Sequence, residues 1–154
     1  ETAAGELHGV TSGALDITCI RAGIPAFMAE LGPGGRFTRP FIDQTKTGFS
    51  NVLKYLKMLD GEPVPCPEKQ ILITKRTFLR SPWGGMLKEN RVKPGDVIRK
   101  GEVMASFHYF TDETWNYETP FDCFIINARE HPVMNTGERI AFVGTQWEDL
   151  EVEA

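Results

Sequence analysis

One carboxylate, that of Glu30, is placed where it could transfer protons. It lies near the carboxyl end of the apolar run 26–31, directly before the glycine-rich residues 32–35. This run has the length and composition of a strand buried on both faces. Ligands of open α/β sheets bind outside the carboxyl ends of strands, where a carboxylate can serve as a general base. The alternative is a structural Glu whose carboxylate accepts hydrogen bonds from loop amides, and spacing alone favours this second role.

The remaining residues that could do chemistry do not form a recognised motif. Residues 32–35 complete neither GxxxxGK[ST] nor GxGxxG, so they predict a turn rather than a phosphate loop. The histidines, His8, His108 and His131, have no second ligand at metal-binding spacing, and we expect no metal ligands in this chain. No serine stands in a GxSxG elbow and no cysteine has a histidine nearby, so a nucleophilic triad is disfavoured.

The segments around Glu30 predict a helix–strand–helix unit of an α/β domain. A helix over 14–22 is expected, with Ser12 as its N-cap and Gly23 as its C-terminal stop. The strand over 26–31 follows. A second helix is expected over 47–59, because its apolar residues recur at helical spacing, and Gly61 is expected to end it.

The second half of the sequence predicts a small all-β domain. Three prolines within 61–69 mark a linker, which places domains at 1–61 and 62–146. Short strands are expected between turn signals, over 71–77, 85–88, 96–99, 102–109, 121–127 and 139–143. The aromatic stretch 110–117 is expected to be a loop. A faint duplication relates 91–98 to 131–140, since each holds a glycine followed by an acid between β-type runs. Residues 147–154 carry four acids and are expected to be a solvated tail.

Composition narrows the classes of protein that fit. The 154 residues are 41% hydrophobic and 25% charged, with a net charge of −4, which disfavours a broad nucleic-acid surface or an anionic membrane face. No apolar stretch approaches the roughly 20 residues of a membrane-spanning helix. Cys19, Cys66 and Cys123 are far apart and odd in number, so a reducing, cytoplasmic setting is expected rather than a disulfide framework.

These segments together resemble the C-terminal part of the succinylglutamate desuccinylase/aspartoacylase family of zinc-dependent deacylases. Residues 22–32, AGIPAFMAELG, are similar to the family's G-I-P-x-x-x-x-E-x-G strand, and residues 48–53, GFSNVL, to its G-x-x-N-V-L segment. The β half agrees at residues 84–85, 92–101 and 119–122. Agreement runs from about residue 9 to residue 144, and the order and spacing of the segments carry it.

The resemblance implies that Glu30 is the general base that activates a zinc-bound water. In the family, the zinc ligands come from an H-x-x-E motif and a later histidine upstream of the matched stretch, and this chain contains none of them. Arg21 and Arg36 are near Glu30 but match no family motif. The resemblance thus implies the C-terminal part of an enzyme that hydrolyses small N-acylated amino acids or similar amides, inactive by itself. Its fold would be the end of a zinc-carboxypeptidase-like α/β domain followed by a β barrel-sandwich.

A non-enzymatic function is the alternative, because the β half is also similar to lipoyl- and biotinyl-type barrel-sandwich modules. Those carriers need a modified lysine at a tight hairpin, and residues 109–115 contain no lysine. A swinging-arm carrier is therefore disfavoured. A role in docking or homo-oligomerisation is left open.

Overall fold

The computed structural model describes residues 13–32, 34–65, 69–109 and 113–151. The chain divides into two compact units, Glu1–Val64 and Pro65–Ala154. We call them the helical unit and the β unit, and describe each by itself. The predicted boundary after residue 61 lies three residues before this division. No helix of the described residues is long and apolar enough to cross a membrane.

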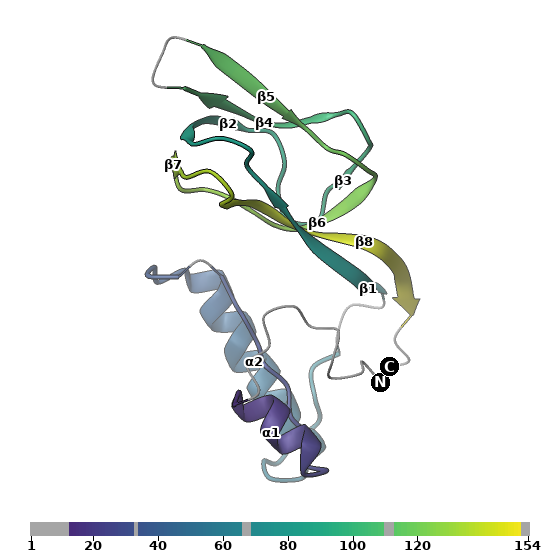
Figure 1. Cartoon of the computed structure of the whole chain (residues 1–154). Coiled ribbons are helices and arrows are strands. Elements are labelled where there is room, and N and C mark those ends of the chain that lie inside the picture. Colours follow the sequence, from purple (N-terminus) through teal and green to yellow (C-terminus); the bar gives the residue numbers. More distant parts are fainter. Residues whose placement is uncertain (1–12, 33, 66–68, 110–112, 152–154) are drawn as a thin grey trace. The chain divides into compact units, whose positions relative to one another are not determined.

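The first helix of the helical unit, α1, spans Leu15–Arg21 and ends as the sequence predicts (Figure 1). The backbone N–H of Ile24 donates to Cys19 O at 2.9 Å and that of Gly23 donates to Ile20 O at 3.0 Å. With Gly23 at a φ of 75°, this is a Schellman motif, and the prediction of Gly23 as the stop is confirmed. Ala14 is the N-cap, and the predicted cap Ser12 lies outside the described residues.

The second helix, α2, spans Arg39–Tyr55, so the prediction of a helix over 47–59 is wrong at both ends. Pro40 stands in the first turn, where a proline needs no hydrogen-bond partner and favours helix initiation. The helix stops before Gly61, because Lys57 adopts a left-handed φ of 57° and forms the same terminal motif. Its N–H donates to Lys54 O at 2.9 Å.

The predicted strand over 26–31 is not formed. Residues 24–31 are extended but pair with no other segment of the described chain. The physical reason is that a strand needs a neighbour for its backbone N–H and C=O groups, and residues 13–32 and 34–64 of the helical unit contain no second strand. The prediction of a strand buried on both faces is therefore wrong, and most residues of this segment are exposed.

The β unit consists of two four-stranded antiparallel sheets with the orders β1-β8-β6-β3 and β5-β4-β2-β7. Figure 1 shows the long strands β1 and β8 side by side. The strands are β1 Lys69–Arg80, β2 Gly85–Asn90, β3 Val97–Ile98, β4 Val103–His108, β5 Thr114–Glu118, β6 Cys123–Ala128, β7 Val133–Met134 and β8 Arg139–Glu151. The predicted all-β half is therefore confirmed as antiparallel sheet. Its fully buried centre includes Met104, Phe107, Cys123, Ile125 and Val143.

Two expectations for the β unit are wrong. Residues 114–117 are not a loop, because β5 pairs with β4, and Trp115 and Tyr117 pack against the core. Residues 147–151 are not a frayed tail, because β8 continues through them and Trp147 pairs with Ile73 of β1. A strand partner that satisfies the backbone outweighs the acidic composition of this segment.

Three turns of the β unit share one construction. Each has a glycine with positive φ, namely Gly95, Gly101 or Gly137, followed by an acid. In each, the acid's side chain accepts a hydrogen bond from the backbone N–H three residues earlier: Asp96 from Lys93 at 2.9 Å, Glu102 from Arg99 at 2.8 Å and Glu138 from Asn135 at 2.7 Å. Two of these turns lie in the predicted duplication.

Candidate functional site

Glu30 lies in the extended segment of the helical unit and its side chain is exposed. Among the described residues, no hydrogen bond or ion pair reaches its carboxylate. The loop-amide contacts expected of a structural Glu are therefore not made within the described part of the chain. The carboxylate is available to a ligand or to water.

Glycines fix the backbone on both sides of this segment. Gly23 turns the chain out of α1, seven residues before Glu30. Gly32, two residues after it, has a φ of 74°, and a Cβ built on it would stand 2.6 Å from Cδ2 of Phe41 in α2. Only glycine allows this approach without displacing the aromatic ring. The glycine of the E-x-G segment thus packs Glu30's segment against the start of α2.

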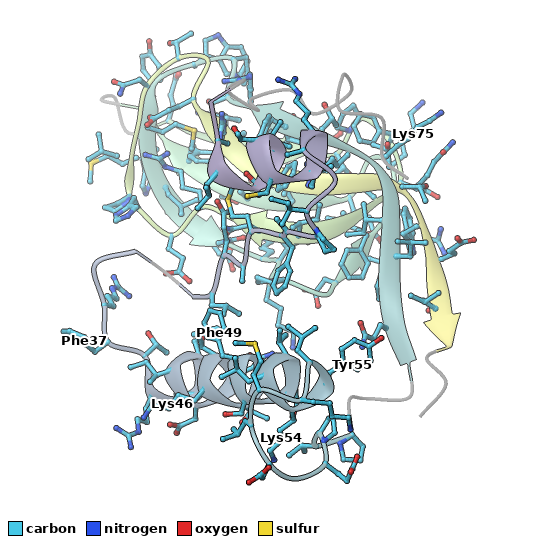
Figure 2. The ribbon with its side chains drawn as sticks, turned by 90° about the horizontal axis from the view of Figure 1, so that it is seen from below. Phe37, Lys46, Phe49, Lys54, Tyr55 and Lys75 are labelled. Carbon is cyan, nitrogen blue, oxygen red and sulfur yellow. The ribbon has the colours of Figure 1, made fainter. Side chains whose placement is uncertain are left out.

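A side-chain clamp holds the end of the helical unit. The Asn51 amide nitrogen donates to Val64 O at 2.8 Å, and the Val64 N–H donates to Asn51 Oδ1 at 2.8 Å. Lys54 adds a 3.0 Å hydrogen bond to Glu62 O and lies on the side of α2 that faces this returning segment (Figure 2). Asn51 is the asparagine of the G-x-x-N-V-L segment, so this motif residue has a defined structural role.

Large apolar side chains of the helical unit are left without a core. Figure 2 labels three of them: Phe37 is 99% exposed, Phe49 58% and Tyr55 77%. Within the described part of this unit, Ile17 is the one buried residue. Burial of apolar area is what stabilises a layer of helix and strand, and the described residues of this unit bury little of it.

The described residues do not form a zinc site. No three His, Cys, Asp or Glu side chains gather closely enough to hold a metal ion in the part of the chain that the structure describes. His108 ends β4, where its Nδ1 lies 3.1 Å from Thr114 Oγ1, and His131 is exposed between β6 and β7. His8 lies outside the described residues. The described residues therefore do not fit a zinc ion.

The two arginines near Glu30 in sequence are both exposed. Arg21 is the last residue of α1. Arg36 lies in the loop before α2 and is not without an interaction partner. Neither is brought to the Glu30 carboxylate as an ion pair. The structure adds no support for either as a substrate ligand.

In the β unit, two segments of the resemblance are bonded to each other. Buried Thr119 donates from Oγ1 to Arg99 O at 2.6 Å, and Asp122 accepts from the Lys100 N–H at 2.8 Å and from Arg99 Nη1 at 2.9 Å. The hydrogen bond from the Lys100 backbone, followed by that from Arg99, lowers the pKa of Asp122 below its ordinary value. Segments 92–101 and 119–122 are thus held together by side-chain hydrogen bonds.

Comparison with solved structures locates this arrangement among known folds. The chain is similar to a succinylglutamate desuccinylase/aspartoacylase from Rhodobacter sphaeroides, with 21% identity and a TM-score of 0.73 over 88% of this chain and 43% of that one. A succinylglutamate desuccinylase from a Silicibacter species gives 21% identity and a TM-score of 0.76 over 90% and 43%. The chain has the fold of part of these proteins. The resemblance to succinylglutamate desuccinylase/aspartoacylase proteins is therefore confirmed as a likeness of fold.

A third neighbour is the product-bound ectoine utilization protein EutE (DoeB) from Ruegeria pomeroyi, with 22% identity, a TM-score of 0.76 and coverage of 87% and 42%. The chain spans about two fifths of the length of the solved proteins it matches. No protein-family model and no curated protein matches the sequence. The solved neighbours therefore establish the fold of this chain and not its activity.

Proposed function

We propose that this chain is the C-terminal portion of a zinc-dependent deacylase that hydrolyses the acyl-amide bond of small N-acylated amino acids or similar compounds. The observation that carries the proposal is the likeness to solved desuccinylase/aspartoacylase proteins, which spans 87–90% of the chain, together with the E-x-G segment that matches the family motif. On this proposal the helical unit is the end of a zinc-carboxypeptidase-like α/β domain. The β unit is the barrel-sandwich that accompanies it.

Glu30 is the residue of this chain that would do chemistry. Its exposed carboxylate, which pairs with none of the described residues, can accept a proton from an attacking water and return it to the leaving amine, as general acid–base catalysis requires. Gly32 and Phe41 fix the backbone that carries it. In a complete enzyme, apolar neighbours around segment 24–31 would exclude water from this carboxylate.

Zinc would supply Lewis-acid activation of the water and the acyl carbonyl. Its ligands would come from a part of the parent protein that this sequence does not contain. The exposed apolar side chains of the helical unit support this proposal, since they are the surface that such a part would cover. We further propose a reducing, cytoplasmic setting, a small-molecule substrate, and no nucleic-acid or membrane partner; homo-oligomerisation is compatible with the same function.

The decisive substitution is Glu30→Gln in the full-length parent protein. It keeps size and hydrogen bonding but removes the base, so turnover should fall by a factor on the order of 10² to 10⁴. Zinc content and thermal stability should change little, because Glu30 is not expected to be a ligand. Glu62→Gln, the same change at an exposed position of the same unit, serves as the control. Normal turnover of Glu30→Gln at full zinc occupancy would refute the assignment and favour a docking role.

The chain by itself offers a second test. A catalytic zinc site needs three protein ligands. After dialysis, metal analysis of the 154-residue chain should show less than one zinc per chain, and the chain should not hydrolyse N-acyl amino acids. A stable one-to-one zinc complex of this chain would contradict the proposed division of the active site.

A further inference from the structure

Three arginine side chains of the β unit line one surface cavity of about 440 Å³. They come from the last residue of β1, the residue after β6 and the first residue of β8. The turn between β7 and β8 completes the wall. The lining residues are Arg80, Arg129, Thr136, Gly137, Glu138 and Arg139.

Two of these arginines are direct cross-strand partners. Arg80 and Arg139 face each other in the antiparallel pairing of β1 and β8, next to a register shift between Leu79 and Arg80. Like charges placed directly opposite in a ladder repel each other and destabilise the pairing. A counter-charge between them would remove this cost.

The wall itself does not provide that counter-charge. Its one acid, Glu138, has Oε1 3.3 Å from Arg129 Nη1, while Oε2 accepts the hydrogen bond from Asn135. Among the described residues, no carboxylate pairs with Arg80 or Arg139. Two of the three positive charges in the cavity therefore have no carboxylate partner in the part of the chain that the structure describes.

The guanidinium groups of Arg80 and Arg139 are held in place. The Arg139 guanidinium carbon lies 3.8 Å from the ring centroid of Phe78, and that of Arg80 lies 5.8 Å from the same centroid. Arg80 Nη1 also donates to Gly137 O at 2.8 Å. Arg139 is close enough to the Phe78 ring to stack on it, and a stacked guanidinium keeps the N–H groups at its edge, which can bind an oxyanion bidentately.

The geometry points to a binding site for a small oxyanion, a phosphate or a carboxylate group, held between Arg80 and Arg139. The anion would accept hydrogen bonds from the edges of both guanidinium groups and neutralise the cross-strand pair. Thr136 offers a hydroxyl donor in the same wall. The site belongs to the β unit alone and does not depend on Glu30 or on the proposed hydrolysis.

The test is a pair of titrations of the complete 154-residue chain, one with sodium phosphate and one with sodium succinate. Ionic strength is held constant with sodium chloride, and the side-chain Nε–Hε signals of the arginines are followed by NMR. The signals of Arg80 and Arg139 should shift saturably with at least one of the two anions. Saturation with phosphate alone identifies a phosphate ligand, and saturation with succinate alone identifies a carboxylate.

Arg139→Gln should weaken the apparent affinity by about tenfold or more, because it removes charge-assisted hydrogen bonds. Arg76→Gln is the matched control: Arg76 stacks on Phe142 at 5.4 Å but does not line the cavity, and its loss should change affinity less than about twofold. Arg80→Gln repeats the test if Arg139→Gln does not keep the wild-type amide spectrum. Unsaturable shifts with both anions in the wild type, or equal effects of the cavity variants and Arg76→Gln, would overturn the site.

Discussion

The backbone N–H of Asn135 donates a 2.7 Å hydrogen bond to Oε2 of Glu138, which closes the turn between β7 and β8 around Gly137. This bond, with the neighbouring Arg129, lowers the pKa of Glu138 below its ordinary value of 4.5. A carboxyl whose folded-state pKa is lowered stabilises the fold above its unfolded-state pKa. That contribution is lost as the pH falls through the folded-state value.

Glu138→Gln should therefore flatten the pH dependence of stability in acid. The amide can still accept the Asn135 hydrogen bond, while the charge is gone. We expect the difference in stability between wild type and variant to be largest at neutral pH and to shrink as the pH falls below 4.5. Urea unfolding at pH 7 and pH 3 measures it. Glu118→Gln, the same change at an exposed position on β5, is the control.

Alanine substitutions at the three glycines after Glu30 should lower stability by different amounts, because the surroundings of the three positions differ. Gly34→Ala should change stability by less than about 0.5 kcal/mol, since a Cβ there meets no atom within 4 Å. Gly35→Ala should cost about 1 kcal/mol because its φ is 74°. Gly32→Ala combines that φ with the contact to Phe41 and should cost the most, roughly 2 kcal/mol or more. Thermal unfolding followed by far-ultraviolet circular dichroism gives the order; equal losses at Gly32 and Gly34 would contradict the packing described.

At the end of α2, one substitution to glycine should stabilise the fold. Lys57 has a φ of 57°, which costs a non-glycine residue about 1–2 kcal/mol, partly offset by the greater unfolded-state entropy of glycine. Lys57→Gly should gain about 0.5–1 kcal/mol. Lys46→Gly, in the middle of the same helix, should lose about 1 kcal/mol. Helix content and unfolding midpoints of the two variants should move in opposite directions, and a loss in both would argue against the terminal motif.

Cys123 should be unreactive in the native chain. Its side chain is fully buried in the β-unit core, and burial, with a smaller effect of the Asp122 charge, raises the pKa of the thiol to about 11. The thiolate is the reactive form, so alkylation at pH 8 should leave Cys123 unmodified until denaturant is added. Peptide mass mapping after iodoacetamide treatment checks this. Partly exposed Cys19 is the internal comparison and should be modified first.

Local signals in the sequence predict local structure well. Gly23 is read correctly as a helix stop because a left-handed glycine is the commonest way to end a helix. Gly95, Gly101 and Gly137 mark their turns because glycine readily adopts the positive φ found at each of them, and the strands lie between these turns. The positive φ of Lys57 was not predicted, because a lysine side chain does not favour that backbone conformation.

Features that depend on a distant partner are harder to predict. The apolar run before Gly32 carries the composition of a strand, but a strand exists only where another strand accepts its hydrogen bonds. The reverse holds at Trp147, whose acidic surroundings suggest a tail until the pairing with Ile73 is known. The cavity between Arg80 and Arg139 was not predicted, since these two residues lie far apart in the sequence and meet only through the pairing of β1 and β8.

The same pairing has an architectural consequence. Lys69 opens β1 and Glu151 closes β8, and the two residues are paired across the ladder. The first and the last paired residues of the β unit's strands are therefore neighbours at one end of the β1–β8 ladder. A β domain whose first and last strands pair with each other can be inserted into another chain without breaking the pairing of its strands, because its two ends already lie close together.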